Sequence, residues 1–260
     1  LLFDKKIASF SPRPVALSRK TLLQAQEFLN QQKHSKYFSA QDLCYTLAKI
    51  VPQNIDEQEM HSLILLTDGE TNLNSLQQRR LIQEWVEQNK NKLSLYTVAT
   101  GNGNNLLFLD LLSALNRGKL LYSDTHASLP RKLSRLILDI NHPIAQKLSA
   151  SAMCQEKEVE LHLLAENLPL PAMFEQKKFT LYGTISKITP FSVTLNGVGP
   201  HGPFVIKKEI DLKRGLMAPD LLKNKWTLYT ARSSYQAYLS TGNEEFLTKS
   251  RPLFPSSHAH

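Results

Sequence analysis

The segment at residues 61–72 is the part of the chain whose residue types point most directly to chemistry. It reads H-S-L-I-L-L-T-D-G-E-T-N, and its apolar run at 62–66 is typical of a parallel strand covered on both faces. Thr67 and Asp68 follow this run directly, at the end of the strand where open α/β sheets hold their ligands. The pattern therefore indicates a ligand site at Asp68. The alternative is a simple turn made by Asp68 and Gly69.

The other residues with catalytic potential form no motif. The chain holds 8 His residues but neither H-E-x-x-H nor G-x-S-x-G, so neither a zinc hydrolase nor a serine hydrolase is indicated. Gly101-Asn102-Gly103 could form a phosphate loop, yet Leu106 stands where the third glycine would be expected, which favours a structural loop. We therefore expect a non-enzymatic protein, although an active site built from distant residues would leave no such motif.

Strand and helix patterns alternate from residue 1 to about residue 140, which predicts an α/β sheet flanked by helices. Apolar residues at helical spacing indicate five helices, near 22–29, 43–50, 81–86, 106–115 and 129–140. Strands are expected at 1–3, 7–10, 62–66, 93–99 and 119–122. Pro143 indicates a domain boundary.

Beyond Pro143 the apolar period changes from that of a helix to that of a strand. Antiparallel strands are predicted at 159–163, 179–185, 191–195 and 204–212, with a Gly- and Pro-rich loop at 196–203. Together they would form a small β-sandwich or β-sheet layer, followed by a helix at 220–239. The predicted units are a partial α/β domain at 1–142, a β-rich domain at 143–213, a C-terminal helical segment at 214–250 and a tail at 251–260.

The T-D-G sequence at 67–69 resembles the third metal-binding loop of the von Willebrand factor A domain, and Y-F-S-A-Q-D-L at 37–43 resembles the family's G-G-T-[DN]-L loop. This resemblance implies a doubly wound, Rossmann-like sheet and a metal-ion-dependent adhesion site. In that site, an Asp or Glu carboxylate of a protein partner completes the coordination of Mg²⁺ or Mn²⁺. By this match the ligands would be Asp68 and Gln41, with Gln41 standing where the family has Thr.

The family's first metal-binding loop, D-x-S-x-S, occurs nowhere in the 260 residues. The resemblance therefore implies a partial A domain with a degenerate adhesion site and without the first, central strand. The remaining strands must then re-pair to close the gap or fold poorly alone. The chain also begins without Met and within a predicted strand, so we expect a fragment or a processed product.

Segments further along resemble the inter-alpha-trypsin inhibitor heavy-chain-like proteins. They are residues 168–174, 179–183, V-T-L-N-G at 193–197 and K-W-T at 225–227. This second resemblance also implies binding of a protein partner, and it favours an extracytoplasmic or secreted location.

The chain is basic, with 31 Lys and Arg against 23 Asp and Glu and a net charge of +8. The excess is spread over short clusters, which is more typical of a solvated basic surface than of a nucleic-acid site. Cys44 and Cys154 allow at most one internal disulfide and fit no zinc spacing. No apolar segment reaches the ~18–20 residues that a membrane span requires.

These observations predict a non-enzymatic protein-interaction or adhesion module of the A-domain type. Two alternatives stay open. One is a basic nucleic-acid-binding protein, and the other is a scaffold protein that needs no metal.

Overall fold

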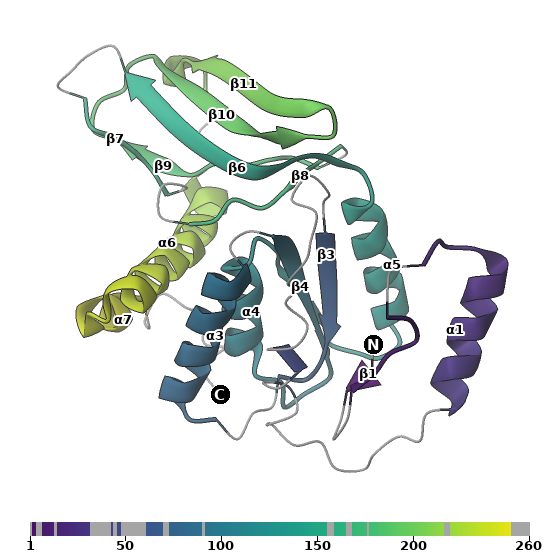
Figure 1. Cartoon of the computed structure of the whole chain (residues 1–260). Helices are drawn as coiled ribbons and strands as arrows, with labels where there is room; N and C mark the ends of the chain where they lie inside the picture. Colours follow the sequence, from purple (N-terminus) through teal and green to yellow (C-terminus); the bar gives the residue numbers. More distant parts are fainter. Residues whose placement is uncertain are drawn as a thin grey trace.

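The structure is a computed structural model that describes residues 2–3, 7–12, 15–31, 43, 46–47, 61–69, 73–89, 92–154, 159–164, 168–175, 177–215 and 219–250. Its centre is a parallel sheet with the strand order β3-β4-β5 (Figure 1). These strands are β3 (His61–Leu66), β4 (Leu93–Thr100) and β5 (Leu120–Ser123). β4 pairs in parallel with both neighbours and is buried along nearly its whole length. The predicted α/β fold class is confirmed.

Successive side chains of β4 point to opposite faces of the sheet, so both faces are apolar. Helices cover both faces. The covering helices are α3 (Ser75–Asn89) and α4 (Leu106–Ala114) on one face and α5 (Leu129–Ile140) on the other (Figure 1). Leu95 belongs to the same buried cluster as Trp85 of α3 and Phe108 of α4. Val98 belongs to a second cluster with Leu136 of α5. This two-sided burial explains why β4 reads as a continuous apolar run.

Buried polar groups fix the point where β4 begins. Asn89, at the end of α3, donates from Nδ2 to the carbonyl oxygen of Leu93 at 3.0 Å and accepts from the Leu93 N–H at 3.0 Å. The same Nδ2 donates to Oδ1 of Asn116 at 2.9 Å. The chain then returns so close to β4 that a Cβ on Gly118 would lie 1.7 Å from the Leu95 carbonyl oxygen. Only glycine fits at this crossing.

The N-terminal segment lies outside the parallel sheet. β1 (Leu2–Phe3) and β2 (Ile7–Ala8) pair antiparallel with each other, and among the described residues neither pairs with β3. α1 (Arg19–Gln31) buries no residue and stands apart from the other helices (Figure 1). Its first turn is capped reciprocally by Ser18 and Thr21, each hydroxyl accepting from the other's backbone N–H. Within the described chain, β1 and β2 therefore do not close the sheet beside β3.

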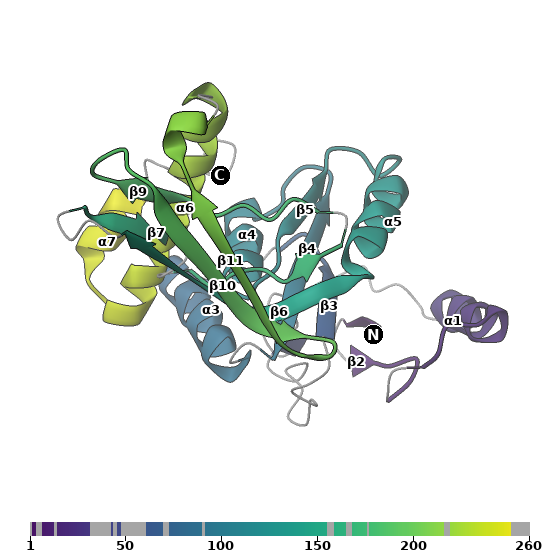
Figure 2. The ribbon, with the colours of Figure 1, turned by 90° about the horizontal axis from the view of Figure 1, so that it is seen from above.

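A second, antiparallel sheet follows, with the strand order β11-β10-β6-β8 (Figure 2). Its core contains Ala145, Leu148, Leu170 and Leu195. β7 and β9 form a separate antiparallel pair. The strands are β6 (Pro143–Cys154), β7 (Leu161–Leu163), β8 (Met173–Phe174), β9 (Gly183–Ile185), β10 (Phe191–Gly199) and β11 (Gly202–Ile210).

Three details of this region differ from the sequence-based predictions. Residues 143–154 form the 12-residue strand β6, which was not predicted; its proline is tolerated as the first strand residue. The loop predicted at 196–203 is wrong, because Gly199 pairs with Gly202 and only Pro200 and His201 lie between them. The strand predicted at 179–185 is reduced to Gly183–Ile185.

Two C-terminal helices, α6 (Pro219–Thr241) and α7 (Glu244–Ser250), follow a short 3-10 turn at Leu212–Arg214. Tyr235 and Tyr238 of α6 join the buried cluster of β4, α3 and α4. Arg232 of α6 donates from Nε to Oδ2 of Asp110 at 3.1 Å and from Nη2 to Oδ1 at 2.5 Å. Asp110 lies on α4, and the two side chains are 8% and 14% exposed, so this is a nearly buried ion pair. Within the described ranges, no helix is both long and apolar enough to cross a membrane.

We expect Asp110→Leu to lower the free energy of unfolding by about 3–5 kcal/mol, because Arg232 would keep a buried charge without its partner. The double variant Asp110→Leu/Arg232→Met should recover most of this loss, since it removes both charges. Urea denaturation followed by circular dichroism measures both values.

The control for this prediction is Asp124→Ala, which breaks the ion pair with Lys132 at 3.5 Å, where Asp124 is 75% exposed. This change should cost no more than about 1 kcal/mol. Equal losses for Asp110→Leu and Asp124→Ala would contradict a stabilising role for the buried pair.

Candidate functional site

The predicted ligand residue Asp68 lies in a tight turn at the carboxyl end of β3. The Thr67 N–H donates to the carbonyl oxygen of Val98 at 3.1 Å, which extends the parallel ladder past the strand end. The Thr67 hydroxyl accepts from the Gly69 N–H at 3.2 Å. Gly69 has φ of +71°, and a Cβ there would lie 2.7 Å from Cγ of Leu109. Backbone geometry and a buried helix side chain thus both require glycine after Asp68.

Two asparagines connect this turn to β4 and α4. The Asn105 N–H donates to the carbonyl oxygen of Asp68 at 2.9 Å, and the Asn105 side chain caps α4 by accepting from the Phe108 N–H at 3.2 Å. Asn104 Nδ2 donates to the carbonyl oxygens of Gly101 at 2.6 Å and Thr100 at 3.2 Å. The loop after β4 is therefore held in one conformation, as the structural interpretation of Gly101-Asn102-Gly103 requires.

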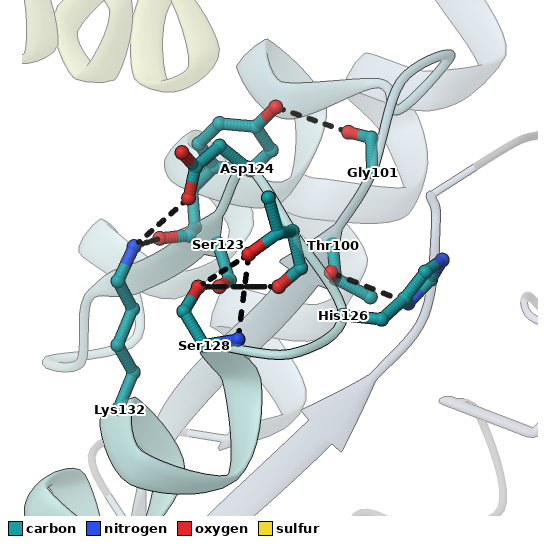
Figure 3. Close-up of polar contacts among 9 residues, drawn as sticks. Thr100, Gly101, Ser123, Asp124, His126, Ser128 and Lys132 are labelled. Atoms are coloured by element: carbon teal, nitrogen blue, oxygen red, sulfur yellow. Dashed lines mark hydrogen bonds and ion pairs between the residues drawn. The ribbon is translucent and has the colours of Figure 1, made fainter.

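A third loop, after β5, completes this edge of the sheet (Figure 3). The Gly101 N–H donates to the Ser123 carbonyl oxygen at 3.1 Å, and the Tyr122 hydroxyl donates to the Gly101 carbonyl oxygen at 3.0 Å. The hydroxyl oxygens of Ser123 and Ser128 lie 2.6 Å apart. His126 points from this loop toward β4, with Nδ1 3.5 Å from Oγ1 of Thr100. Three loops from three adjacent strands thus form one polar surface, which we call the carboxyl-edge surface.

The polar groups of the described loop after β5 mainly contact one another. The Ser123 hydroxyl also donates to the Thr125 carbonyl oxygen at 3.0 Å, so the serines of this loop serve its internal hydrogen bonds. Asp124 pairs with Lys132 at 3.5 Å (Figure 3). The His126 ring lies at the long distance of 3.5 Å from the Thr100 hydroxyl.

The structure describes one of the two predicted metal ligands, Asp68. Among them, no group of three or more His, Cys, Asp and Glu side chains could hold a metal ion. Asp68 lies at the expected strand end, whereas Gln41 falls outside the described residues, so its predicted role as a ligand is not examined by the structure. The Oδ1 atom of Asn104 is buried and accepts no hydrogen bond from the described residues.

Sequence reasoning located Asp68 but missed the loop after β5. Its residues Ser123, Thr125 and Ser128 have no motif spacing that could mark them as a site. The available signal was their position, because polar residues directly after a predicted parallel strand meet the other loops at the same edge.

The thiol of Cys154 is free, and its Sγ lies 3.7 Å from the carbonyl oxygen of Pro190.

Comparison with known proteins supports one fold. No family model matches the sequence, and no curated protein matches it. A solved structure described as von Willebrand factor type A from Catenulispora acidiphila has 11% sequence identity and a TM-score of 0.52, covering 91% of this chain and 67% of that one. The ArnB paralog VWA2 from Sulfolobus acidocaldarius has 15% identity and a TM-score of 0.42, covering 85% and 60%.

The chain therefore has the fold of a von Willebrand factor type A domain, which confirms the predicted resemblance at the level of the fold. The more specific resemblance to inter-alpha-trypsin inhibitor heavy chains stays a prediction. At 11% identity the likeness concerns the arrangement of strands and helices, and any function must be argued from the surface itself.

We expect Gly69→Ala to destabilise the fold by about 2–4 kcal/mol, since the added methyl group meets both an unfavourable φ and the Leu109 side chain. Gly103→Ala is the matched control: its φ is +82°, but no atom lies within 4 Å of the added Cβ. This control should lose only about 1 kcal/mol. Urea midpoints of the two variants measure the difference, and an equal loss would show that the Leu109 contact contributes nothing.

Proposed function

We propose that this chain is a non-enzymatic protein-interaction module whose recognition surface is the carboxyl-edge surface around Asp68. The observation that supports it is the A-type fold combined with a carboxylate at the end of β3, where open α/β sheets bind their ligands. Adhesion, in the sense of binding a partner at a cell surface, is the form of this function that the sequence resemblance implies.

The carboxyl-edge surface is well suited to binding because hydrogen bonds connect the described residues of its loops. The Asp68 carbonyl oxygen accepts from Asn105, and the Ser123 carbonyl oxygen accepts from Gly101, so each loop is attached to its neighbour by a backbone hydrogen bond. A rigid surface loses little conformational entropy on association. Asn102, at the tip of the middle loop, is exposed and available to a partner.

The proposal includes recognition that does not depend on Mg²⁺ or Mn²⁺. It is supported by the sequence resemblance, in which Gln41 stands where the family has a metal-binding Thr, as in a degenerate adhesion site. In this form the Asp68 carboxylate is itself the recognition group, and it would favour a basic or hydrogen-bond-donating residue of the partner.

A photo-crosslinking experiment tests the surface. Benzoylphenylalanine is placed at Asn102, in the exposed part of the loop after β4, or at Gln83, an exposed position on α3. Each purified variant is irradiated in an extract of the source organism. We expect a discrete protein adduct from position 102 and none of that mass from position 83. Adducts at 83 alone would contradict the choice of surface.

Asp68→Ala, added to the Asn102 probe, should raise the partner concentration required for half-maximal adduct formation at least about 30-fold. This factor corresponds to about 2 kcal/mol of binding free energy, which is typical of a hot-spot residue. Glu84→Ala, which removes an exposed carboxylate of α3, is the control and should change nothing. Circular dichroism verifies that both variants fold. An undiminished adduct with Asp68→Ala would reject Asp68 as the recognition group.

The same experiment separates the alternatives. The adduct should survive chelation of divalent cations by EDTA; its loss would show that the interaction is metal-dependent. An adduct that disappears after nuclease treatment, together with binding that weakens steeply with salt, would instead favour nucleic-acid binding by this chain of net charge +8.

A further inference from the structure

A cavity of about 290 Å³ lies far along the chain from the carboxyl-edge surface, between the β8–β9 segment and α6. Leu168, Leu170 and Phe179 contribute to its lining from the segment around β8, and Tyr229 does so from α6. Its volume is close to the lower limit of small-molecule sites, which is roughly 300 Å³. The two walls come from segments that are separated in the sequence and meet only in the folded chain.

The floor of the cavity is apolar and firmly packed. Leu170 is 8% exposed and belongs to the buried core of the second sheet, and Phe179 and Leu181 pack against that core. A floor supported in this way keeps its shape without a ligand. It offers a place for an apolar chain or ring and removes that group from water.

The rim of the cavity is basic. Lys177, Lys178 and Lys225 all line it, and no Asp or Glu is found among the described residues of its lining. Lys177 is already paired with Asp139 of α5 at 2.8 Å. Neither Lys178 nor Lys225 has an ion-pair partner among the described residues. Two ammonium groups on one small rim favour an anionic head group.

Two phenols complete the polar side. The rings of Tyr182 and Tyr229 lie 4.6 Å apart between centroids. Burial, together with the neighbouring Tyr229, raises the pKa of Tyr182, so this phenol stays protonated at neutral pH and can donate a hydrogen bond. The guanidinium of Arg232, which is paired with Asp110, lies 5.6 Å from the Tyr229 ring centroid and helps to hold this ring in place.

We propose that this cavity binds a small amphipathic anion, a carboxylate carried on an apolar chain or ring. The apolar part would lie on the Leu170 floor, and the carboxylate would lie at the rim between Lys178 and Lys225. The cavity volume of about 290 Å³ is near that of small-molecule sites, which begin at roughly 300 Å³. This site is separate from the carboxyl-edge surface and does not depend on the proposed partner recognition.

Isothermal titration calorimetry of the whole chain with three probes of equal tail length tests the head group. The probes are decanoate, decanol and decylammonium. We expect saturable binding of decanoate, binding at least about tenfold weaker for decanol because its head group is uncharged, and none for decylammonium. Equal affinities for decanoate and decanol would overturn the role of the basic rim, and no decanoate binding would overturn the proposal.

A pair of double variants tests the location. Lys178→Gln/Lys225→Gln removes two rim charges and should weaken decanoate binding about tenfold. Lys207→Gln/Lys208→Gln removes the same charge from β11, outside the lining, and should leave the affinity unchanged. An equal loss in both double variants would show a nonspecific effect of net charge and would overturn the proposed site.

Discussion

The burial of β4 on both faces is the constraint on which the rest of the structure depends. A strand with two apolar faces is stable only if helices cover both of them, and the clusters around Leu95 and Val98 show how α3, α4 and α5 meet this demand. The buried hydroxyl of Thr97 donates to the Leu109 carbonyl oxygen at 3.0 Å, so the polar group within this strand is also satisfied. The positions of β4 and α4 in turn fix the Asp68 turn, because Gly69 lies against Leu109.

The ion pair between Asp110 and Arg232 connects the C-terminal helix α6 to the helix α4 that covers β4. Its partners are 122 residues apart in sequence, and the pair attaches α6 to the back of α4. The same guanidinium lies over the ring of Tyr229, which lines the cavity beside β8. A contact that anchors one helix to the α/β domain therefore also positions one wall of the cavity. This arrangement couples the stability of α6 to the shape of the cavity without any direct contact between the cavity and the carboxyl-edge surface.

How far the sequence predicts this structure depends on the strength of the apolar pattern. The strands β3 and β4 and the helix α5 were predicted closely, because continuous or strongly periodic apolar runs leave few alternatives. β6 was missed, since it begins at Pro143 and its exposed half carries small residues such as Ser149 and Ser151 that give no clear strand signal. Asp68 could be placed because it directly follows a buried strand. The buried ion pair and the cavity could not be predicted, because each joins segments that are far apart in the sequence. No local sequence pattern indicates that these segments meet.

The carboxyl-edge surface shows why the A-type fold by itself does not determine chemistry. The fold delivers three strand ends to one edge, but the loops that follow decide what this edge can bind. Here most polar groups of the loops are used internally: Asn105 caps α4, Asn104 holds the β4 loop, and Ser128 contacts Ser123. These bonds hold the described loop residues in place beside Asp68, which follows β3 at the same edge. Rigid loops suit the recognition of a partner's shape that we propose for this surface, whereas the small anion that we propose would bind in a different region, at the lysines beside α6.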